Sequence, residues 1–279
     1  MRAPRLCRTA DGIELRGTVT PGTGPGVLLI HGLASNARIW DGVVAELETR
    51  GRAVAAFDLR GHGQSQQASD GYTIDQLAAD VGAILETLRA TDPVWAQPIV
   101  AGQSLGGNVV LALAASGTDL TGIALVDGGF IDLSARYTTW LACADALTPP
   151  DLSHLTPEQL EGMLRAEHPD WSDVAIDGIA ACWSEEDGRI APRLTRDHHL
   201  ALLRSLYDSP PTLYASRVRT PTTIIACDGA ETDAVKQATI ERLAAALAEC
   251  RCVWRDDADH DIHAQHPHDV AAIMLGTDA

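Results

Sequence analysis

The sequence predicts an α/β fold in which helices cover both faces of a mostly parallel sheet. Short apolar, β-branched runs alternate with longer amphipathic segments along most of the 279 residues, and this alternation is typical of βαβ units. The rhythm breaks after Gly129, and helix-like pieces separated by Pro-Pro pairs fill residues 131–216 before it resumes at Thr222. We therefore expect one sheet that is interrupted by a mostly helical insertion.

The expected strands begin with a hairpin. Leu6–Thr9 and Ile13–Val19 flank Asp11-Gly12, a dipeptide that favours a tight turn between antiparallel strands. The next four runs are continuously apolar, as strands that are buried on both faces require. They are Val27–Ile30, Ala53–Phe57, Pro98–Ala101 and Gly122–Val126, and Thr222–Cys227 and Cys252–Trp254 continue the pattern after the insertion.

The expected helices lie between and after these runs. Thr73 is suited to cap the N-terminus of a helix over Thr73–Arg89, and Gly51 and Gly117 are suited to end the helices that precede them. The remaining helices are expected at Ala37–Arg50, Gly106–Ser116, Thr156–Glu167, Asp197–Tyr207, Thr232–Ala248 and Pro267–Leu275.

Composition and charge exclude several classes of protein. Hydrophobic residues make up 46% and charged residues 21% of the chain, which is ordinary for a globular protein and argues against disorder or a coiled coil. The net charge of −17 would repel nucleic acids and anionic membranes, so neither is expected as a partner. The sequence shows no signal-peptide pattern or long apolar run, and its six cysteines form no CxxC pair. We expect a cytoplasmic protein.

The strongest chemical signal is Gly102-Gln103-Ser104-Leu105-Gly106, directly after an expected strand and directly before an expected helix. A serine hydroxyl becomes a useful nucleophile when a rigid turn exposes it beside a base and near oxyanion donors. The flanking glycines are needed because Cβ atoms would collide where the backbone folds back on itself. The N-terminal amides of the following helix favour negative charge at the site.

With three other segments, this motif resembles the α/β-hydrolase family over most of the chain. His31-Gly32-Leu33 is similar to the family's His-Gly oxyanion loop, and the run Asp58-Leu59-Arg60-Gly61-His62-Gly63-Gln64-Ser65 is similar to its signature after the next strand. Asp259-His260-Asp261-Ile262-His263, followed by His266-Pro267, resembles the catalytic-histidine loop and the helix after it.

The resemblance implies the α/β-hydrolase fold and a set of roles. Ser104 matches the nucleophile and His260 the general base, while the backbone N–H groups of Leu33 and Leu105 match the two oxyanion donors. No cofactor or metal is implied. A metal site among His260 and its neighbouring histidines is the alternative, but no cysteine or paired carboxylate completes a ligand set there. His31 and His62 are expected to shape loops rather than to act as bases.

The acid that orients the histidine is left open. The family usually carries it in a Gly-x-x-Asp loop after the strand that corresponds to Thr222–Cys227, but here Cys227 stands in the place of the glycine. Three carboxylates compete in the loop that follows: Asp228, Glu231 and Asp233.

Asp127 is the other candidate for the acid. It matches the second position that the family uses, at the end of the preceding strand of the central sheet. It lies 23 residues after Ser104, about one helix plus one strand, which brings both residues to the same edge of the sheet. Any of the four carboxylates would hold the histidine tautomer and stabilise the imidazolium.

The insertion is expected to decide the choice of substrate. We expect a hydrolase core over residues 1–130 and 217–279 and a helical cap over 131–216. Trp140, Trp171 and Trp183 lie in this cap; they either fasten small helices to the sheet or line an apolar pocket. Gly32 and Trp183 are expected to contact a small-molecule substrate, and a homodimer is left open.

The expected reaction is hydrolysis of a carboxylic ester or lactone through an acyl-serine intermediate. A serine in this place disfavours the dehalogenase and epoxide hydrolase chemistries of the fold, because these need a carboxylate nucleophile. C–C bond hydrolysis of diketo compounds and cofactor-free perhydrolysis are the alternatives within the fold. A third alternative is a small-molecule binder that does not catalyse a reaction.

Overall fold

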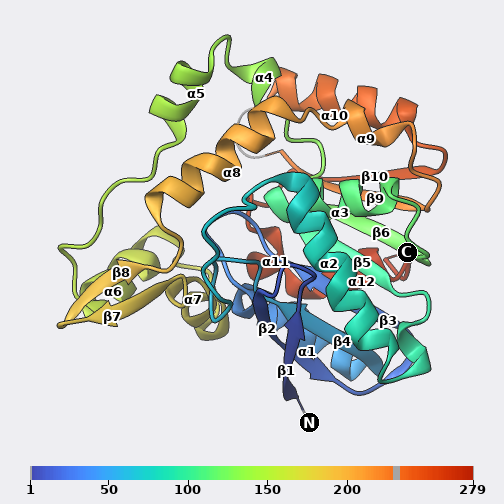
Figure 1. Ribbon diagram of the computed structural model, residues 1–279, viewed down its shortest axis with the longest axis horizontal. Coiled ribbons are helices and arrows are strands. Elements are labelled where there is room, and N and C mark those ends of the chain that lie inside the picture. The colour runs from blue at the N-terminus through green and yellow to red at the C-terminus, as the bar shows by residue number, and fades with distance from the viewer. Residues whose placement is uncertain (1, 229–232, 279) are drawn as a thin grey trace.

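The computed structural model describes residues 2–228 and 233–278. In this part of the chain, eight strands form one sheet in the order β1-β2-β4-β3-β5-β6-β9-β10 (Figure 1). β1 and β2 form the predicted hairpin, β2 also pairs antiparallel with β4, and all pairs from β4 onward are parallel. The strands are β1 (Ala3–Arg8), β2 (Glu14–Thr20), β3 (Thr23–Ile30), β4 (Arg52–Phe57), β5 (Ile99–Gln103), β6 (Gly122–Val126), β9 (Thr222–Cys227) and β10 (Cys250–Arg255).

The sheet has an apolar core on each face, as the continuous apolar runs predict. On β3, Leu28 and Ile30 belong to one core, whereas Val27 and Leu29 belong to the other, because successive side chains of a strand point to opposite faces. The first core is covered by α2 (Ile74–Arg89), α3 (Leu105–Ala115) and α10 (Ala234–Ala246), and the second by α1 (Asp41–Thr49) and α12 (Pro267–Met274). The predicted fold class is confirmed.

Most predicted helices appear with small changes at their ends. The Thr73 hydroxyl accepts a hydrogen bond from the backbone N–H of Gln76 and caps α2, as predicted. The segment predicted as one helix over Ala37–Arg50 is divided into a 3₁₀ turn, η1 (Ala37–Trp40), and α1. Outside the insertion, two short elements of the described residues are additional: η2 (Pro93–Trp95) and α11 (Ile262–Gln265).

The insertion between β6 and β9 is mostly helical but also contains a hairpin. In Figure 1, one group of its elements lies at the top and another, with the hairpin, at the left. The top group is α4 (Leu133–Arg136), α5 (Trp140–Leu147) and α8 (Arg196–Asp208), and the left group is α6 (Pro157–Glu167), α7 (Asp173–Ala180), β7 (Trp183–Glu186) and β8 (Arg189–Pro192). A last short helix, α9 (Thr212–Ala215), precedes β9.

Two of the insertion's tryptophans pack on neighbouring aromatic rings. Trp171 is buried and stacks on His168, and Trp140 meets Tyr207 edge to face. Both contacts join residues of the insertion to one another. Trp171 also belongs to one apolar core of the sheet and Trp140 packs against the other, in keeping with the interpretation that they fasten small helices to the sheet.

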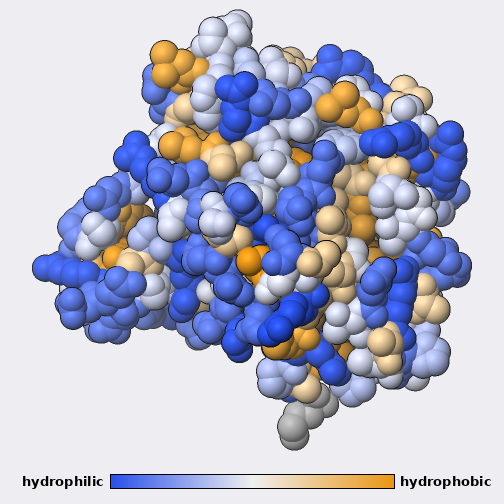
Figure 2. Space-filling view, in the orientation of Figure 1, coloured by the Kyte–Doolittle hydropathy of each residue, from blue (hydrophilic) through white to orange (hydrophobic). Residues whose placement is uncertain are grey.

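The face of the molecule that Figure 2 draws is mostly hydrophilic. Figure 2 shows isolated apolar spots on a face that is dominated by polar side chains, in keeping with the high net charge. Of the helices in the described part of the chain, none has the length and apolar character needed to cross a lipid bilayer.

Candidate active site

Ser104 stands on a strained turn between β5 and α3. Its backbone has φ 53° and ψ −123°, a conformation that residues other than glycine rarely adopt and that clusters at functional sites. Backbone lies directly against this turn, since a Cβ at Gly128 would come within 2.7 Å of Ser104 Cα and one at Gly102 would overlap the Gly106 carbonyl. The Ser104 side chain is half-buried, and its Oγ makes no hydrogen bond to any residue of the described ranges. The turn therefore presents a hydroxyl that has no hydrogen-bond partner among the described residues.

The loop after β3 runs beside Ser104. A Cβ at Gly32 would lie 3.1 Å from Ser104 Cβ, so the absence of a side chain at this position lets the loop come close to the serine. Neither the backbone N–H of Leu33 nor that of Leu105 has a hydrogen-bond partner within residues 2–228 and 233–278. Two unpaired donors therefore stand on the segments that flank Ser104.

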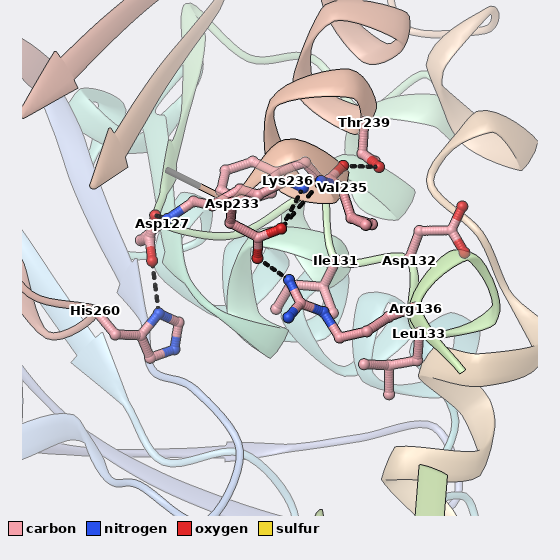
Figure 3. A pocket seen from close by; sticks show the side chains of 11 residues that line it. Asp127, Ile131, Asp132, Leu133, Arg136, Asp233, Val235, Lys236, Thr239 and His260 are labelled. Atoms are coloured by element: carbon pink, nitrogen blue, oxygen red, sulfur yellow. Dashed lines mark hydrogen bonds and ion pairs between the residues drawn. The ribbon is translucent and has the colours of Figure 1, made fainter. Parts of the chain in front are cut away.

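His260 and Asp127 are in direct contact. His260 lies on the loop between β10 and α11, and its Nδ1 is 2.6 Å from Oδ2 of Asp127, which follows β6 (Figure 3). Asp127 is 4% exposed, whereas the His260 side chain is 53% exposed. With Nδ1–H donating to the carboxylate, Nε2 of the neutral ring is left as the proton acceptor.

Each partner shifts the titration of the other. Burial lowers the pKa of His260, but the hydrogen bond and charge of Asp127, together with the charge of Asp261, raise it overall. Burial raises the pKa of Asp127, but the His260 hydrogen bond and the charges of His260 and Lys236 hold it below its ordinary value. The carboxylate is therefore ionised at neutral pH and favours a positive charge on the imidazole.

The other candidate acids lie elsewhere or outside the described residues. Asp233 caps α10 through the N–H groups of Val235 and Lys236 and pairs with Arg136. The backbone N–H of Asp228 bonds to the carbonyl of Arg255, and its side chain makes no hydrogen bond to His260. Glu231 lies outside the described residues. Of the candidate acids that are described, Asp127 alone contacts His260.

His31 and His62, the histidines of the two N-terminal motifs, are buried and hydrogen-bonded to backbone. His31 Nε2 accepts a hydrogen bond from the N–H of Leu59, and burial lowers the pKa of His31 to about 4. His62 Nε2 accepts from the N–H of Ala34, and burial lowers the pKa of His62 to about 3. Both rings therefore shape loops in the neutral form. Among the described residues, no group of three or more His, Cys, Asp or Glu side chains is arranged to hold a metal ion.

Gln103 connects the serine turn to the histidine loop. Its Nε2 donates to the carbonyl of His260 at 3.1 Å and lies 3.4 Å from Asp261 Oδ1. Because Gln103 precedes Ser104, this side chain ties the histidine loop to the turn. The motif leaves this position variable, so the pattern carries no signal for its role.

Two cavities lie around the site. The first, of about 220 Å³, lies beside Asp127 and His260 and is lined also by Lys236 and the Arg136–Asp233 pair (Figure 3). The second, of about 390 Å³ and mainly apolar, begins at Ala34, next to the Leu33 loop. Its other walls come from the insertion and include Pro149, Pro150, Leu152, Trp183, Leu194 and His199. Trp183 therefore lines an apolar cavity, which is the second interpretation of the insertion's tryptophans.

A family model described as "Alpha/beta hydrolase family" matches residues 27–273, nearly the whole chain. The chain belongs to the alpha/beta hydrolase family. The fold agrees with this assignment: the crystal structure of E-2-(acetamidomethylene)succinate hydrolase superposes on this family member with a TM-score of 0.79 over 100% of both chains, at 24% sequence identity.

Curated relatives match a shorter part of this family member. An esterase of Mycobacterium tuberculosis is 38% identical over 107 residues, covering 38% of this chain and 34% of the relative. A non-heme haloperoxidase of Rhodococcus erythropolis is 36% identical over 89 residues, covering 32% of this chain and 31% of the relative. The chain thus spans about a third of the length of these relatives. Family and names support a hydrolase without specifying its substrate.

Proposed function

We propose that this hydrolase cleaves a carboxylic ester or lactone of a small, apolar or aromatic molecule through an acyl-serine intermediate. Ser104 is the nucleophile, His260 the general base and then the general acid, and Asp127 the acid that orients the imidazole. The observation that carries this proposal is the 2.6 Å contact between His260 and Asp127. The loop that bears His260 is tied to the turn of Ser104 by the side chain of Gln103.

The proposed reaction has two halves. Ser104 Oγ attacks the carbonyl carbon while its proton passes to His260 Nε2, and the resulting oxyanion is stabilised by the N–H groups of Leu33 and Leu105. The C–O bond then breaks, and His260 returns the proton to the leaving alcohol oxygen. In the second half, water attacks the acyl-serine with His260 as its base, which releases the carboxylic acid and restores the serine.

The substrate class rests on the cavity that begins at Ala34. Its apolar wall favours an apolar acyl or alcohol group. Gly32, whose missing side chain lets its loop lie against Ser104, is proposed to contact the substrate through its backbone. We propose the insertion, residues 131–216, as the cap of the active site, because it supplies most of this wall.

The proposal is tested with p-nitrophenyl esters, lactones and a fluorophosphonate probe. We expect the probe to label wild-type Ser104, and we expect kcat/KM to fall by about 10⁵-fold or more in Ser104→Ala and by about 10⁴-fold in Asp127→Asn. Asp228→Asn is the matched control, with the same chemical change at a carboxyl that does not contact His260, and should retain activity.

Each contrary result has a defined meaning. If Asp228→Asn loses activity while Asp127→Asn keeps it, the assignment of the acid is wrong. Rapid cleavage of diketo compounds with slow ester turnover would replace ester hydrolysis by C–C bond hydrolysis. A folded wild type that the probe does not label would be a binder without catalysis.

A second candidate function is perhydrolysis, favoured by the name of the haloperoxidase relative. Here hydrogen peroxide replaces water in the second half and attacks the acyl-serine, so that a carboxylic acid and peroxide give a peracid and water. Production of peracid from acetate and hydrogen peroxide that depends on Ser104 would support it.

A further inference from the structure

Lys236 is the only lysine in the chain; the other 20 of the 21 basic residues are arginines. It lies in the first turn of α10, on the opposite side of Asp127 from His260 (Figure 3). Its side chain is 17% exposed. The one lysine of the chain therefore lies beside the carboxylate that contacts His260.

The contacts of Asp127 divide between its two oxygens. Oδ1 accepts from the backbone N–H of Cys227 at 2.9 Å and is paired with Lys236 Nζ at 2.6 Å. Oδ2 is left for Nδ1 of His260. Lys236 Nζ also donates to the carbonyl of Cys227, so the ammonium group joins the carboxylate to the end of β9.

The shape of the site favours lysine over arginine. A lysine ammonium is a compact charge with three donors in tetrahedral directions, whereas a guanidinium is a wide planar fork. Here one nitrogen serves two acceptors that belong to neighbouring strands, and its stem lies near Phe130, with Nζ 5.6 Å from the ring centroid. A planar guanidinium would present its nitrogens to these two acceptors in a different geometry.

We propose that Lys236 is the positioning residue of the catalytic carboxylate. By occupying Oδ1 of Asp127, it holds Oδ2 toward His260. Its positive charge also offsets part of the negative charge by which Asp127 stabilises the protonated imidazole. This inference rests on the proposed function, because it assigns a role relative to His260 as base. Lys236 itself touches neither Ser104 nor a reacting atom in the proposed reaction.

A consequence for pH follows from the charges around His260. The ring faces Asp127 at the end of β6, Lys236 on α10 and Asp261 on its own loop, and the Arg136–Asp233 pair lines the same cavity. His263, behind the loop, is buried and neutral because burial lowers its pKa to about 3. The two aspartates raise the pKa of His260 and the Lys236 charge lowers it. With Lys236 present, His260 therefore stays unprotonated at a lower pH than it would with the two aspartates alone.

The test measures the rate of fluorophosphonate labelling of Ser104 against pH, which requires no knowledge of the natural substrate. In wild type the rate should rise with pH as His260 loses its proton. In Lys236→Met we expect this rise to move up by roughly one pH unit, and the rate on the alkaline plateau to fall about tenfold because Asp127 is less firmly held. Lys236→Arg restores the charge, so it should return the rise to within a few tenths of a pH unit of wild type while recovering only part of the plateau.

Arg136→Met is the matched control. It removes one positive charge from the same cavity without a bond to Asp127, so the pH of its rise should move much less than in Lys236→Met. Equal shifts in the two variants would overturn the positioning role, as would a Lys236→Met profile identical to that of wild type. Failure of this inference can be told from failure of the proposed function. If Ser104→Ala and Asp127→Asn leave the labelling unchanged, the proposed function has failed. If these two variants abolish the labelling while Lys236→Met has no effect, only the inference about Lys236 has failed.

A second measurement keeps Lys236 in place, in case Lys236→Met does not fold. Because the chain has one lysine, protein labelled with ¹⁵N-lysine gives one ammonium signal. We expect slow proton exchange at that signal in wild type and fast exchange in Asp127→Asn. Fast exchange in wild type, as for a lysine in open solvent, would contradict the proposal.

Discussion

The edge of the sheet where the parallel strands end, which carries Ser104, and the insertion that borders it are packed in different ways. At the edge, backbone lies on backbone: Gly128 touches the Ser104 turn so closely that a Cβ has no room. In the insertion, proline, leucine and tryptophan side chains enclose an open volume of about 390 Å³. Within the proposed function, the path of the chain determines the chemistry and the side chains of the insertion determine the substrate.

The largest effect that separates the two regions should come from one added methyl group. Gly128→Ala forces a Cβ into the backbone of Ser104, and we expect it to lower the free energy of unfolding by about 3 kcal/mol and to prevent fluorophosphonate labelling. Gly162→Ala is the control in the insertion: no atom lies within 4 Å of the added Cβ, and alanine in α6 should stabilise the fold by about 0.5–1 kcal/mol. Chemical denaturation of both variants measures the difference; similar losses would contradict the contrast.

A second difference should appear in acid. His31, His62 and His263 support the sheet-edge loops as buried neutral rings, with pKa values lowered by burial to about 4, 3 and 3. The unfolded chain takes up protons on these rings below pH 6.5 and the folded chain does not. Their contribution to stability is therefore complete above pH 6.5 and is lost as the pH falls toward 4.

Urea unfolding between pH 7.5 and 4.5 checks this expectation. Each such histidine adds a slope of up to about 1.4 kcal/mol per pH unit, so His62→Gln should be less stable at pH 7.5 but less sensitive to acid. His268→Gln replaces a histidine that is 70% exposed and should retain the wild-type slope. A wild-type stability that does not change over this range would contradict the neutral state of the buried rings.

The smallest effect should come from the insertion's cavity. Trp183→Ala removes an apolar wall without touching Ser104, so we expect KM for an apolar p-nitrophenyl ester to rise about tenfold with little change in kcat. Trp254→Ala, at a tryptophan that is 41% exposed on β10, is the control and should leave both constants unchanged. An unchanged KM in Trp183→Ala would remove this residue from the substrate pocket.

Much of the fold could be predicted because each local signal agrees with the sheet. The apolar runs give the observed strands, the Thr73 cap begins α2, and the Asp11-Gly12 turn joins β1 to β2. The hairpin β7–β8 was missed because residues 183–192 have no β-branched run. Asp187-Gly188, both with positive φ (50° and 73°), was the available turn signal.

The candidate site was predictable in its motifs but not in its contacts. Spacing alone does not tell which of two strand ends faces the histidine loop, so the sequence leaves the carboxylates after β9 open as alternatives to Asp127. Lys236 belongs to no motif, and a lysine in the first turn of a helix usually faces solvent. The sequence therefore gives no sign of its contact with Asp127. Gln103 occupies a position that the motif leaves variable.

Asp127 directly follows β6 rather than β9, and this places the alcohol and the carboxylate on one β-α-β unit, residues 99–127. The two groups are therefore joined through a short, fully packed stretch of chain, and only the imidazole arrives from a distant part. Lengthening, exchanging or reopening the chain between residues 128 and 259 would leave the serine and its carboxylate together. A circular permutant or a chimera with a foreign insertion then has two connections to re-establish: the return of His260 to the edge of the sheet, and the contacts of Cys227 and Lys236 with Asp127.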